Sequence, residues 1–274
     1  MSQMRKTIIY FLTLSFILAV CQHCSGDKGT EPKPSTTEES GIAGKVILTG
    51  NWPDTPEEVR LITAQTFPPD IDDIVMGESI PLNTDTYDYR FDLDPATYSM
   101  VGVAWRPEGT DWSLLSICGL YFSEGDSLAP GQVVIKDSNT VIKNINIDVD
   151  RSKVRKITDT KIIGSITFQG TWPADIVEAR VIASTKFNLA PLEVPTFLDL
   201  GFSDAIPPGT TQIDYVVQAF PATFAATGIL FFREGEKLTV EDIIYSSSVG
   251  GLNLESYEVR EDSTFNGPDF EITF

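Results

Sequence analysis

The sequence predicts an all-β protein: two tandem Greek-key β-sandwich domains that follow a signal peptide and a flexible tether. Several segments alternate apolar and polar residues with the period of two that is typical of half-buried strands. The same succession of segments occurs twice, about 120 residues apart, and no segment keeps a helical period of 3.6. With 274 residues, 42% of them hydrophobic, the chain is long enough for about two packed domains.

Residues 1–20 are predicted to be a signal peptide. Arg5 and Lys6 supply its positive start, and residues 8–20 form an apolar run of 13 residues. This run is shorter than the roughly 20 residues needed to span a membrane, and it is typical of the hydrophobic part of an export signal. We therefore expect the mature chain to be exported from the cytoplasm.

The apolar run ends at Cys21, in the sequence LAVC. This resembles the lipobox of bacterial lipoproteins, except that Val20 stands where a small residue is usual. The resemblance implies that Cys21 carries a lipid and that the protein is anchored in the outer membrane, facing the periplasm or the surface. Ordinary secretion is the alternative. Residues 21–40 lack the apolar content to pack and are predicted to be a flexible tether.

An internal duplication divides the rest of the chain. The segment that begins GKVILTGNWPDTPEEVR at Gly44 matches GSITFQGTWPADIVEAR at Gly164, and later matches lie 126 residues apart. The two predicted domains cover residues 41–150 and 158–274, and each is expected to fold on its own. A basic linker, residues 151–157, lies between them. It either adds only solubility or pairs with carboxylates of the first domain.

Local patterns place the strands of the predicted sandwich. Apolar and polar residues alternate most clearly in the string YDYRFDL, residues 87–93. Two runs, residues 113–122 and 238–247, are ambiguous and could hold a helical turn. From the number and brevity of the strands we expect antiparallel sheets with Greek-key connections. The other predicted strands cover residues 42–48, 59–66, 98–105, 132–136, 145–149 and 162–168.

The string FDLDPATYSMVGVAW, residues 91–105, occurs again as AFPATFAATGIL in the second copy. Both resemble the strand–Pro-Gly-Thr-Tyr–strand corner of carboxypeptidase-regulatory-like and prealbumin-like (transthyretin-like) domains, with Ala96 and Ala222 in place of glycine. The resemblance implies a seven-stranded, immunoglobulin-like sandwich, in which Tyr98 and Phe224 pack into the cores. It implies no particular activity, because many functions share this fold.

Composition argues against several functional classes. A net charge of −19 does not suit a protein that binds a nucleic-acid backbone. The one histidine, His23, lies in the tether, so the predicted domains lack the residue needed for Ser–His–Asp or Cys–His catalysis and for histidine-ligated zinc. Cys118 lies within a β pattern and is expected to be a small buried residue. We predict no enzymatic activity, no cofactor and no metal.

Candidate binding residues are few. A loop tryptophan can stack on a sugar ring, or it can cap the open end of a sandwich. Acidic residues 70–73 could hold Ca²⁺, but the string lacks the glycine and terminal glutamate of an EF-hand, which favours a solvated loop. The tryptophans considered for stacking are Trp52, Trp105, Trp112 and Trp172.

Together these features predict a cell-envelope lipoprotein that displays two non-catalytic β-sandwich modules with a binding or scaffolding role at the cell surface. The alternative is a carbohydrate-binding accessory lipoprotein of a glycan-uptake or degradation system. The expected partners are the membrane, through the lipid anchor, and a protein or glycan ligand, but not nucleic acid.

Overall fold

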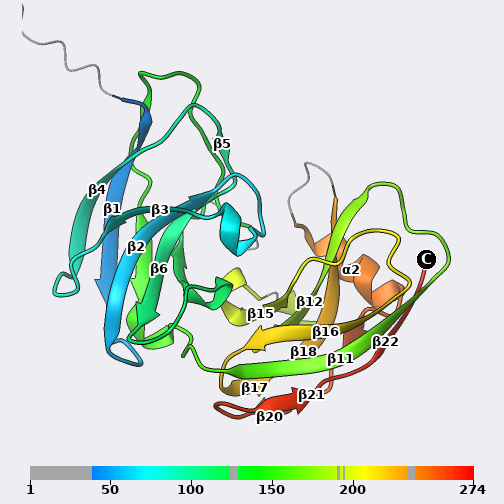
Figure 1. Ribbon diagram of the computed structural model, residues 1–274. Helices are drawn as coiled ribbons and strands as arrows, with labels where there is room; N and C mark the ends of the chain where they lie inside the picture. Colours follow the sequence, from blue (N-terminus) through cyan, green and yellow to red (C-terminus); the bar gives the residue numbers. More distant parts are fainter. Residues whose placement is uncertain (1–38, 124–128, 190–191, 194, 234–237) are drawn as a thin grey trace, which may run out of the picture. The chain divides into compact units, whose positions relative to one another are not determined.

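The computed structural model describes residues 39–123, 129–189, 192–193, 195–233 and 238–274 (Figure 1). The regular structure of these residues is almost entirely β, which confirms the predicted fold class. The predicted signal peptide, Cys21 and the tether up to residue 38 lie outside the described residues. Within the described ranges, no helix has the length and apolarity required to cross a bilayer.

The first repeat (residues 41–150) forms two facing sheets, with strand orders β10-β1-β4 and β3-β2-β6-β7. The first sheet contains β1 (Gly41–Thr49), β4 (Thr86–Asp92), β10 (Ile147–Asp150) and the short β9 (Val141–Ile142) beside β1. The second contains β2 (Pro56–Ala64), β3 (Val75–Ser79), β6 (Met100–Pro107) and β7 (Ile117–Leu120). A small ladder pairs β5 (Thr97–Tyr98) with β8 (Val133–Val134). Short 3₁₀ turns are η1 (Ile71–Asp73) and η2 (Leu114–Ser116).

The second repeat (residues 158–274) has the same strand order, but its strands join into one sheet, β19-β18-β12-β15-β16-β11-β21, with β22 also pairing with β11. The join is β15, which pairs with both β12 and β16, whereas its counterpart β3 is paired with β2 alone among the described residues. The strands are β11 (Thr160–Gln169), β12 (Ile176–Ser184), β15 (Leu200–Ser203), β16 (Gln212–Ala219), β18 (Ala226–Arg233), β19 (Leu252–Asn253), β21 (Thr264–Asn266) and β22 (Phe270–Thr273).

Smaller elements complete the chain. The corner strand β17 (Ala222–Phe224) pairs with β20 (Tyr257–Val259), as β5 pairs with β8 in the first repeat. A hairpin joins β13 (Asn188–Leu189) and β14 (Leu192–Glu193), and the 3₁₀ turns are η3 (Arg151–Lys153) and η4 (Phe197–Asp199). Each strand lies inside one of the two predicted domain ranges. The domain boundaries themselves, and the independent folding of each domain, remain predictions.

The expectation of purely antiparallel sheets is wrong at one edge of each repeat. Strand β1 pairs in parallel with β10, and β11 pairs in parallel with β22. Parallel neighbours need a long crossover connection, and here the whole of each repeat supplies it. The first and last strands of each repeat are therefore hydrogen-bonded to each other.

A tyrosine hydrogen bond fixes how the two repeats align at their ends. The Tyr89 hydroxyl donates to the Ile145 carbonyl over 2.6 Å, and the Tyr215 hydroxyl donates to the Pro268 carbonyl over the same distance. Ile145 is therefore equivalent to Pro268, 123 residues further on. From the sequence alone, the alternating runs at residues 145–149 and 270–274 match each other, but this match is two residues out of register, because short alternating strands match equally well after a shift of two.

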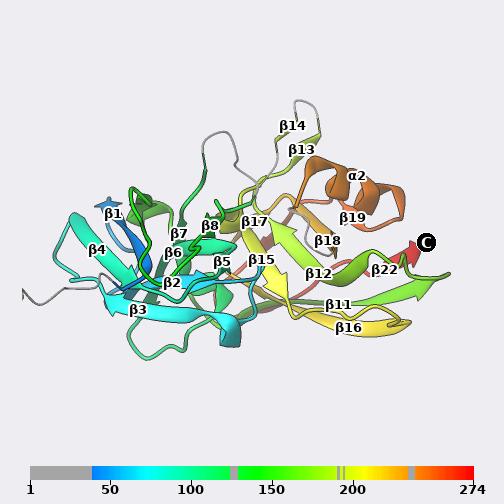
Figure 2. The same ribbon diagram turned by 90° about the horizontal axis from the view of Figure 1, so that it is seen from above.

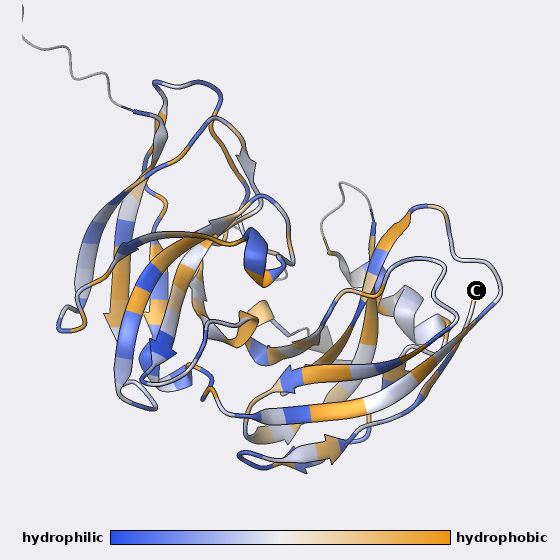
Figure 3. Ribbon diagram, viewed as in Figure 1, coloured by the Kyte–Doolittle hydropathy of each residue, from blue (hydrophilic) through white to orange (hydrophobic). Residues whose placement is uncertain are grey.

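Each repeat has its own apolar core, built on the predicted alternation (Figure 3). In β4 the side chains of Tyr89 and Phe91 are buried, while Asp88 and Arg90 are exposed. The corner aromatics are also buried as predicted: Tyr98 is 4% exposed and Phe224 is fully buried. The corner thus packs into the core in both repeats.

A third cluster contains residues of both repeats and was not expected. Strands β6 and β18 are buried on both faces, because the faces that point away from the two cores meet other apolar side chains. The alternation along residues 98–105 predicts that Tyr98 and Met100 share a face, and this is wrong: Tyr98 belongs to the first core but Met100 to this shared cluster. The strand is interrupted at Ser99, between β5 and β6. The shared cluster consists of Ile62, Ala64, Met100, Ala104, Ile117, Leu120, Ile182, Phe197, Leu200, Phe202, Leu230 and Ile243.

The two ambiguous runs adopt different structures. Residues 113–122 form η2 followed by β7, whereas residues 238–247 fall mostly in the helix α2 (Val240–Ser248). The side chain of Asp242 accepts hydrogen bonds from the amide and hydroxyl of Thr239, which caps the start of α2. The helix packs against β18 (Figures 1 and 2). The repeats therefore have the same strand order but differ in the segment that connects β6 to β7 and β18 to β19.

Candidate functional site

A buried arginine of the linker bonds to both repeats. Arg155 is 4% exposed, and its guanidinium donates to the carbonyls of Ile117 over 2.6 Å and of Leu200 over 2.7 Å. A further bond reaches the Leu114 carbonyl over 3.0 Å. Burial lowers the pKa of Arg155 to about 10, which leaves it charged at neutral pH. The sequence predicts an exposed linker and does not reveal this role, since nothing local separates Arg155 from its basic neighbours.

Other linker cations pair with carboxylates of either repeat. Arg151 binds Asp85 of the first repeat over 2.7 Å, and Lys156 binds Glu261 of the second over 2.6 Å. The sequence offered either a role in solubility, the favoured interpretation, or pairing with carboxylates of the first domain, and the structure shows ion pairs with both repeats. Exposed pairs of this kind contribute little stability individually. The buried Arg155 and the shared cluster are the stronger links between the repeats.

The linker also forms one wall of a polar groove, which we call the groove. Its volume is about 840 Å³. The first repeat contributes residues 54–55 and part of the loop at 107–113, and the second contributes Gln218, Glu261 and Asp262. Residues 156–161 connect the two sides. A second hollow, of about 580 Å³, lies beside it and shares Glu108, Thr110 and Asp111 with it.

Trp112 is the aromatic residue of the groove. Its side chain is partly exposed, and the Arg106 guanidinium lies over the ring with its central carbon 5.4 Å from the centroid. Arg106 is held by the Thr110 carbonyl over 2.8 Å and by Glu57 over 3.0 Å. Arg106 Nε and Ser113 Oγ are buried and have no hydrogen-bond partner within the described residues, and Arg106 lies behind Trp112 without lining the groove itself. Such atoms are rare in folded proteins.

The groove is acidic. Six carboxylates line it, against two lysines. Both lysines are neutralised, Lys156 by Glu261 and Lys161 by Asp159 over 2.7 Å. The hydrogen bond that Lys156 donates to the Glu261 carboxylate is the main reason why the pKa of Lys156 is raised. Of the six groove carboxylates, four have no ion pair among the described residues: Asp54, Glu108, Asp111 and Asp262.

The other three candidate tryptophans lie elsewhere. Trp105 is fully buried in the first core, so its ring is not available to a ligand. Trp52 stacks on it with ring centroids 5.2 Å apart and an interplanar angle of 19°. Trp172 packs against Phe168 and Phe274, and its Nε1 donates to the Thr210 carbonyl over 3.0 Å. The structure thus brings Trp112 alone of the four to the groove.

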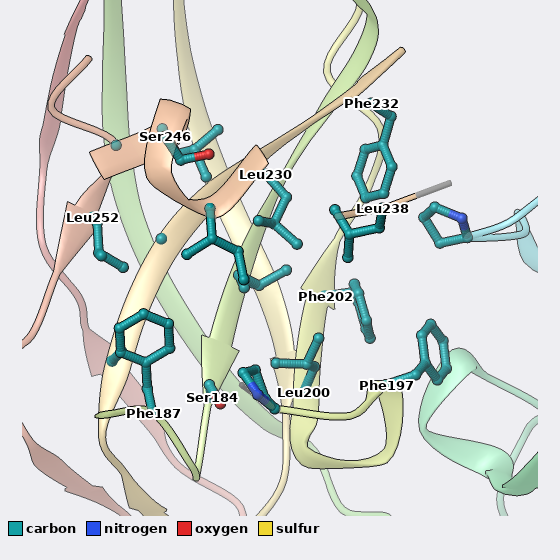
Figure 4. A pocket seen from close by; sticks show the side chains of 18 of the residues that line it. Ser184, Phe187, Phe197, Leu200, Phe202, Leu230, Phe232, Leu238, Ser246 and Leu252 are labelled. Atoms are coloured by element: carbon teal, nitrogen blue, oxygen red, sulfur yellow. The ribbon is translucent and has the colours of Figure 1, made fainter. Parts of the chain in front are cut away.

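A separate crevice in the shared cluster is almost wholly apolar (Figure 4). Phenylalanine and leucine side chains from β15, β18 and neighbouring segments point into it, including Phe202, Leu230 and Phe232. Its free volume is about 30 Å³. This is room for about one or two waters, which an apolar lining does not retain. We interpret the crevice as a packing gap rather than a ligand site.

Cys118 and the acidic loop offer no reactive centre. Cys118 is 5% exposed, its thiol points to the Val103 carbonyl over 3.3 Å, and burial raises its pKa. Asp72 and Asp73 are exposed, whereas Asp70 pairs with the buried Arg180 of the second repeat over 2.7 Å. The solvated-loop interpretation was therefore incomplete for Asp70. Across the described ranges no cluster of three or more histidine, cysteine, aspartate or glutamate side chains could hold a metal ion.

No protein-family model matches the sequence, and no curated protein matches it. Among solved structures, the chain matches a candidate adhesin of Bacteroides ovatus at 13% identity over 91% of this chain and 96% of the other, with a TM-score of 0.24. A candidate cell adhesion protein of the same species matches at 11% identity over 86% and 95%, with a TM-score of 0.19. The shaft pilin SpaA of Lactobacillus rhamnosus GG matches at 6% over 86% and 98%, with a TM-score of 0.18. TM-scores this low do not establish a shared fold.

Proposed function

We propose that the protein is an outer-membrane lipoprotein that displays two non-catalytic β-sandwich modules of the prealbumin-like type, with a binding or scaffolding role at the cell surface. The observation that carries the proposal is the order of the chain: a short apolar leader that ends at Cys21, a polar tether, and then a body of β-strands. This order suits a folded body held away from a membrane by a lipid anchor.

The folded body is better suited to presenting a binding surface than to catalysing a reaction. Cys118 is buried with a raised pKa, and the folded repeats contain no histidine. The contacts of Arg155 and the shared cluster connect the two repeats, so a partner bound to one repeat is held firmly relative to the other. Rigid presentation lowers the entropy that a binding surface loses when it engages a partner.

Cell fractionation tests the anchor. The wild-type chain and Cys24→Ser, the matched control in the tether, should sediment with the outer membrane. Cys21→Ser should be released into the soluble fraction, because it lacks the thiol that would carry the lipid. A soluble wild-type protein with an unmodified amino terminus would show that the anchor assignment is wrong. Protease treatment of intact cells then determines which side of the membrane the body faces.

A second candidate function is that of a carbohydrate-binding accessory lipoprotein in a glycan-uptake or degradation system. The observation that favours it is the groove, in which a partly exposed tryptophan lies among carboxylates and hydroxyl groups. Aromatic faces and convergent polar groups are the combination that sugar recognition uses.

A further inference from the structure

We propose that the groove beside Trp112 binds a neutral, polyhydroxylated glycan chain, one per protein. This inference rests on the carbohydrate-binding candidate above and specifies its site and its ligand class. The groove's volume of about 840 Å³ lies within the range of small-ligand sites, roughly 300–1,000 Å³. The smaller hollow across the 107–111 loop, which shares Thr110 and Asp111 with it, extends the same surface.

Charge excludes one class of glycan. Both lysines of the groove are paired, while Asp54, Glu108 and Asp111 have no ion pair among the described residues. An acidic polysaccharide would place its carboxylates or sulfates against this negative wall, and like charges in juxtaposition oppose binding. The same wall can accept hydrogen bonds from sugar hydroxyls, because ionised carboxylates are acceptors only.

Neutral polar side chains of the groove argue for a ligand that also accepts hydrogen bonds. Thr55 and Gln218 line it, and their hydroxyl and amide groups can donate as well as accept. A polycation would satisfy the carboxylates but would offer few acceptors to these donors. A hydroxyl group donates and accepts at once, so a sugar chain can bind the acidic wall and these neutral side chains together.

The second repeat does not reproduce the site. By the pairing of β2 with β6 and of β12 with β18, Phe232 occupies the position of Arg106. Phe232 lines the apolar crevice (Figure 4). In the second repeat a guanidinium lies over a tyrosine instead, with the central carbon of Arg233 5.2 Å from the centroid of the Tyr245 ring. The indole–guanidinium pair beside the groove is therefore particular to the first repeat. This difference predicts one binding site per chain.

Titration calorimetry on the Cys21→Ser chain, which keeps the folded body, tests the proposal. The probes are neutral gluco-, manno- and xylo-oligosaccharides, with oligogalacturonate as the acidic probe and oligolysine as the cationic one. We expect binding of at least one neutral oligosaccharide with a stoichiometry near one, and none of oligogalacturonate.

Substitutions then locate the site. Trp112→Ala should weaken binding about tenfold or more, which corresponds to about 1.4 kcal/mol, while Trp112→Phe should retain most of it. Asp111→Asn should weaken binding, and Asp72→Asn, a matched change outside the groove, should leave it unchanged. Circular dichroism and the urea midpoint of each variant show whether the fold is kept.

Three outcomes would overturn the proposal. They are the absence of binding to every neutral probe at millimolar concentration, binding of oligolysine alone, which would indicate a basic peptide ligand, and sugar binding that Trp112→Ala leaves intact in a folded chain. None of these outcomes changes the fractionation of wild type and Cys21→Ser. The binding and fractionation experiments therefore distinguish an error in the proposed glycan site from an error in the proposed lipid anchor.

Discussion

The two repeats carry the same Gly-x-Trp-Pro turn, yet their tryptophans have different surroundings. In the second repeat Trp172 packs against Phe168, Phe231 and Phe274, and its Nε1 donates to Thr210. In the first repeat Trp52 stacks on Trp105, and its Nε1 is buried with no partner within the described residues. The tryptophan of this turn is therefore covered by aromatic rings and hydrogen-bonded in the second repeat, whereas its indole N–H in the first repeat has no partner within the described residues.

The cause lies at the ends of the repeats. By the register of the parallel strands, Arg151 occupies the position of Phe274. Phe274 covers Trp172, whereas Arg151 extends to the carbonyl oxygens of β1 and to Asp85. The first repeat continues into the linker at this point, and the linker then forms a wall of the groove. The two repeats keep the same strand order, and at this end they differ in the chain segments that leave the sheets.

The largest expected effect concerns a position where the repeats agree. Phe224 is fully buried and lies among Phe220 and Tyr257. Phe224→Ala should lower the free energy of unfolding by about 3–5 kcal/mol, because it leaves a cavity that the core cannot fill. Urea unfolding of the whole chain measures this loss.

Tyr98→Phe is the matched change in the first repeat. It keeps the ring in the core and removes only the hydroxyl, which donates to the Asp94 carbonyl over 3.0 Å. The expected loss is about 1 kcal/mol or less. An unchanged urea midpoint for Phe224→Ala would show that the core-facing register assigned to both corners is wrong.

The sequence predicted the strands in which apolar and polar residues alternate, but it did not predict the cluster that covers the second face of strands buried on both sides. In β4, one face meets the core and the other meets water, so Tyr89 and Asp88 reveal their positions through the period of two. In β6, Met100 and Ala104 are as buried as Val101 and Val103, and the period disappears. Such a run signals burial on both faces, but it does not say which distant segment covers the second face.

The candidate site was harder to predict than the fold. Trp112 was one of four tryptophans considered for stacking, and Trp105, its neighbour at the same loop, is a core residue. The groove needs the linker, the 107–113 loop and the second repeat together, and these are far apart in the chain. Arg155 illustrates the same limit. Arg155 joins the repeats because the carbonyls of Leu114 and Leu200 lie close together, and only the tertiary structure brings them there.

An intermediate effect is expected where the two repeats are joined. Arg155→Met should lower the free energy of unfolding by about 2–3 kcal/mol. The substitution leaves the buried carbonyls of Ile117 and Leu200 without their donor, and this outweighs the relief of a buried charge. Lys153→Met, at a side chain that is 80% exposed, is the control and should change stability little. Equal urea midpoints for wild type and Arg155→Met would show that the two repeats gain nothing from this arginine.

The smallest effect tests the comparison of the two tryptophans directly. Trp172→Phe and Trp52→Phe remove the same atoms, so the apolar area lost is similar. Trp172→Phe also breaks the bond to the Thr210 carbonyl, whereas Trp52→Phe removes a buried donor that had no partner among the described residues. Leaving a buried polar group unpaired is unfavourable, so its removal offsets part of the lost packing. We therefore expect Trp172→Phe to cost about 1 kcal/mol more than Trp52→Phe, measured as the difference between their urea unfolding free energies. Equal losses would mean that Trp52 Nε1 is as well satisfied as Trp172 Nε1, for instance by a bound water, and the contrast between the two ends would then rest on packing alone.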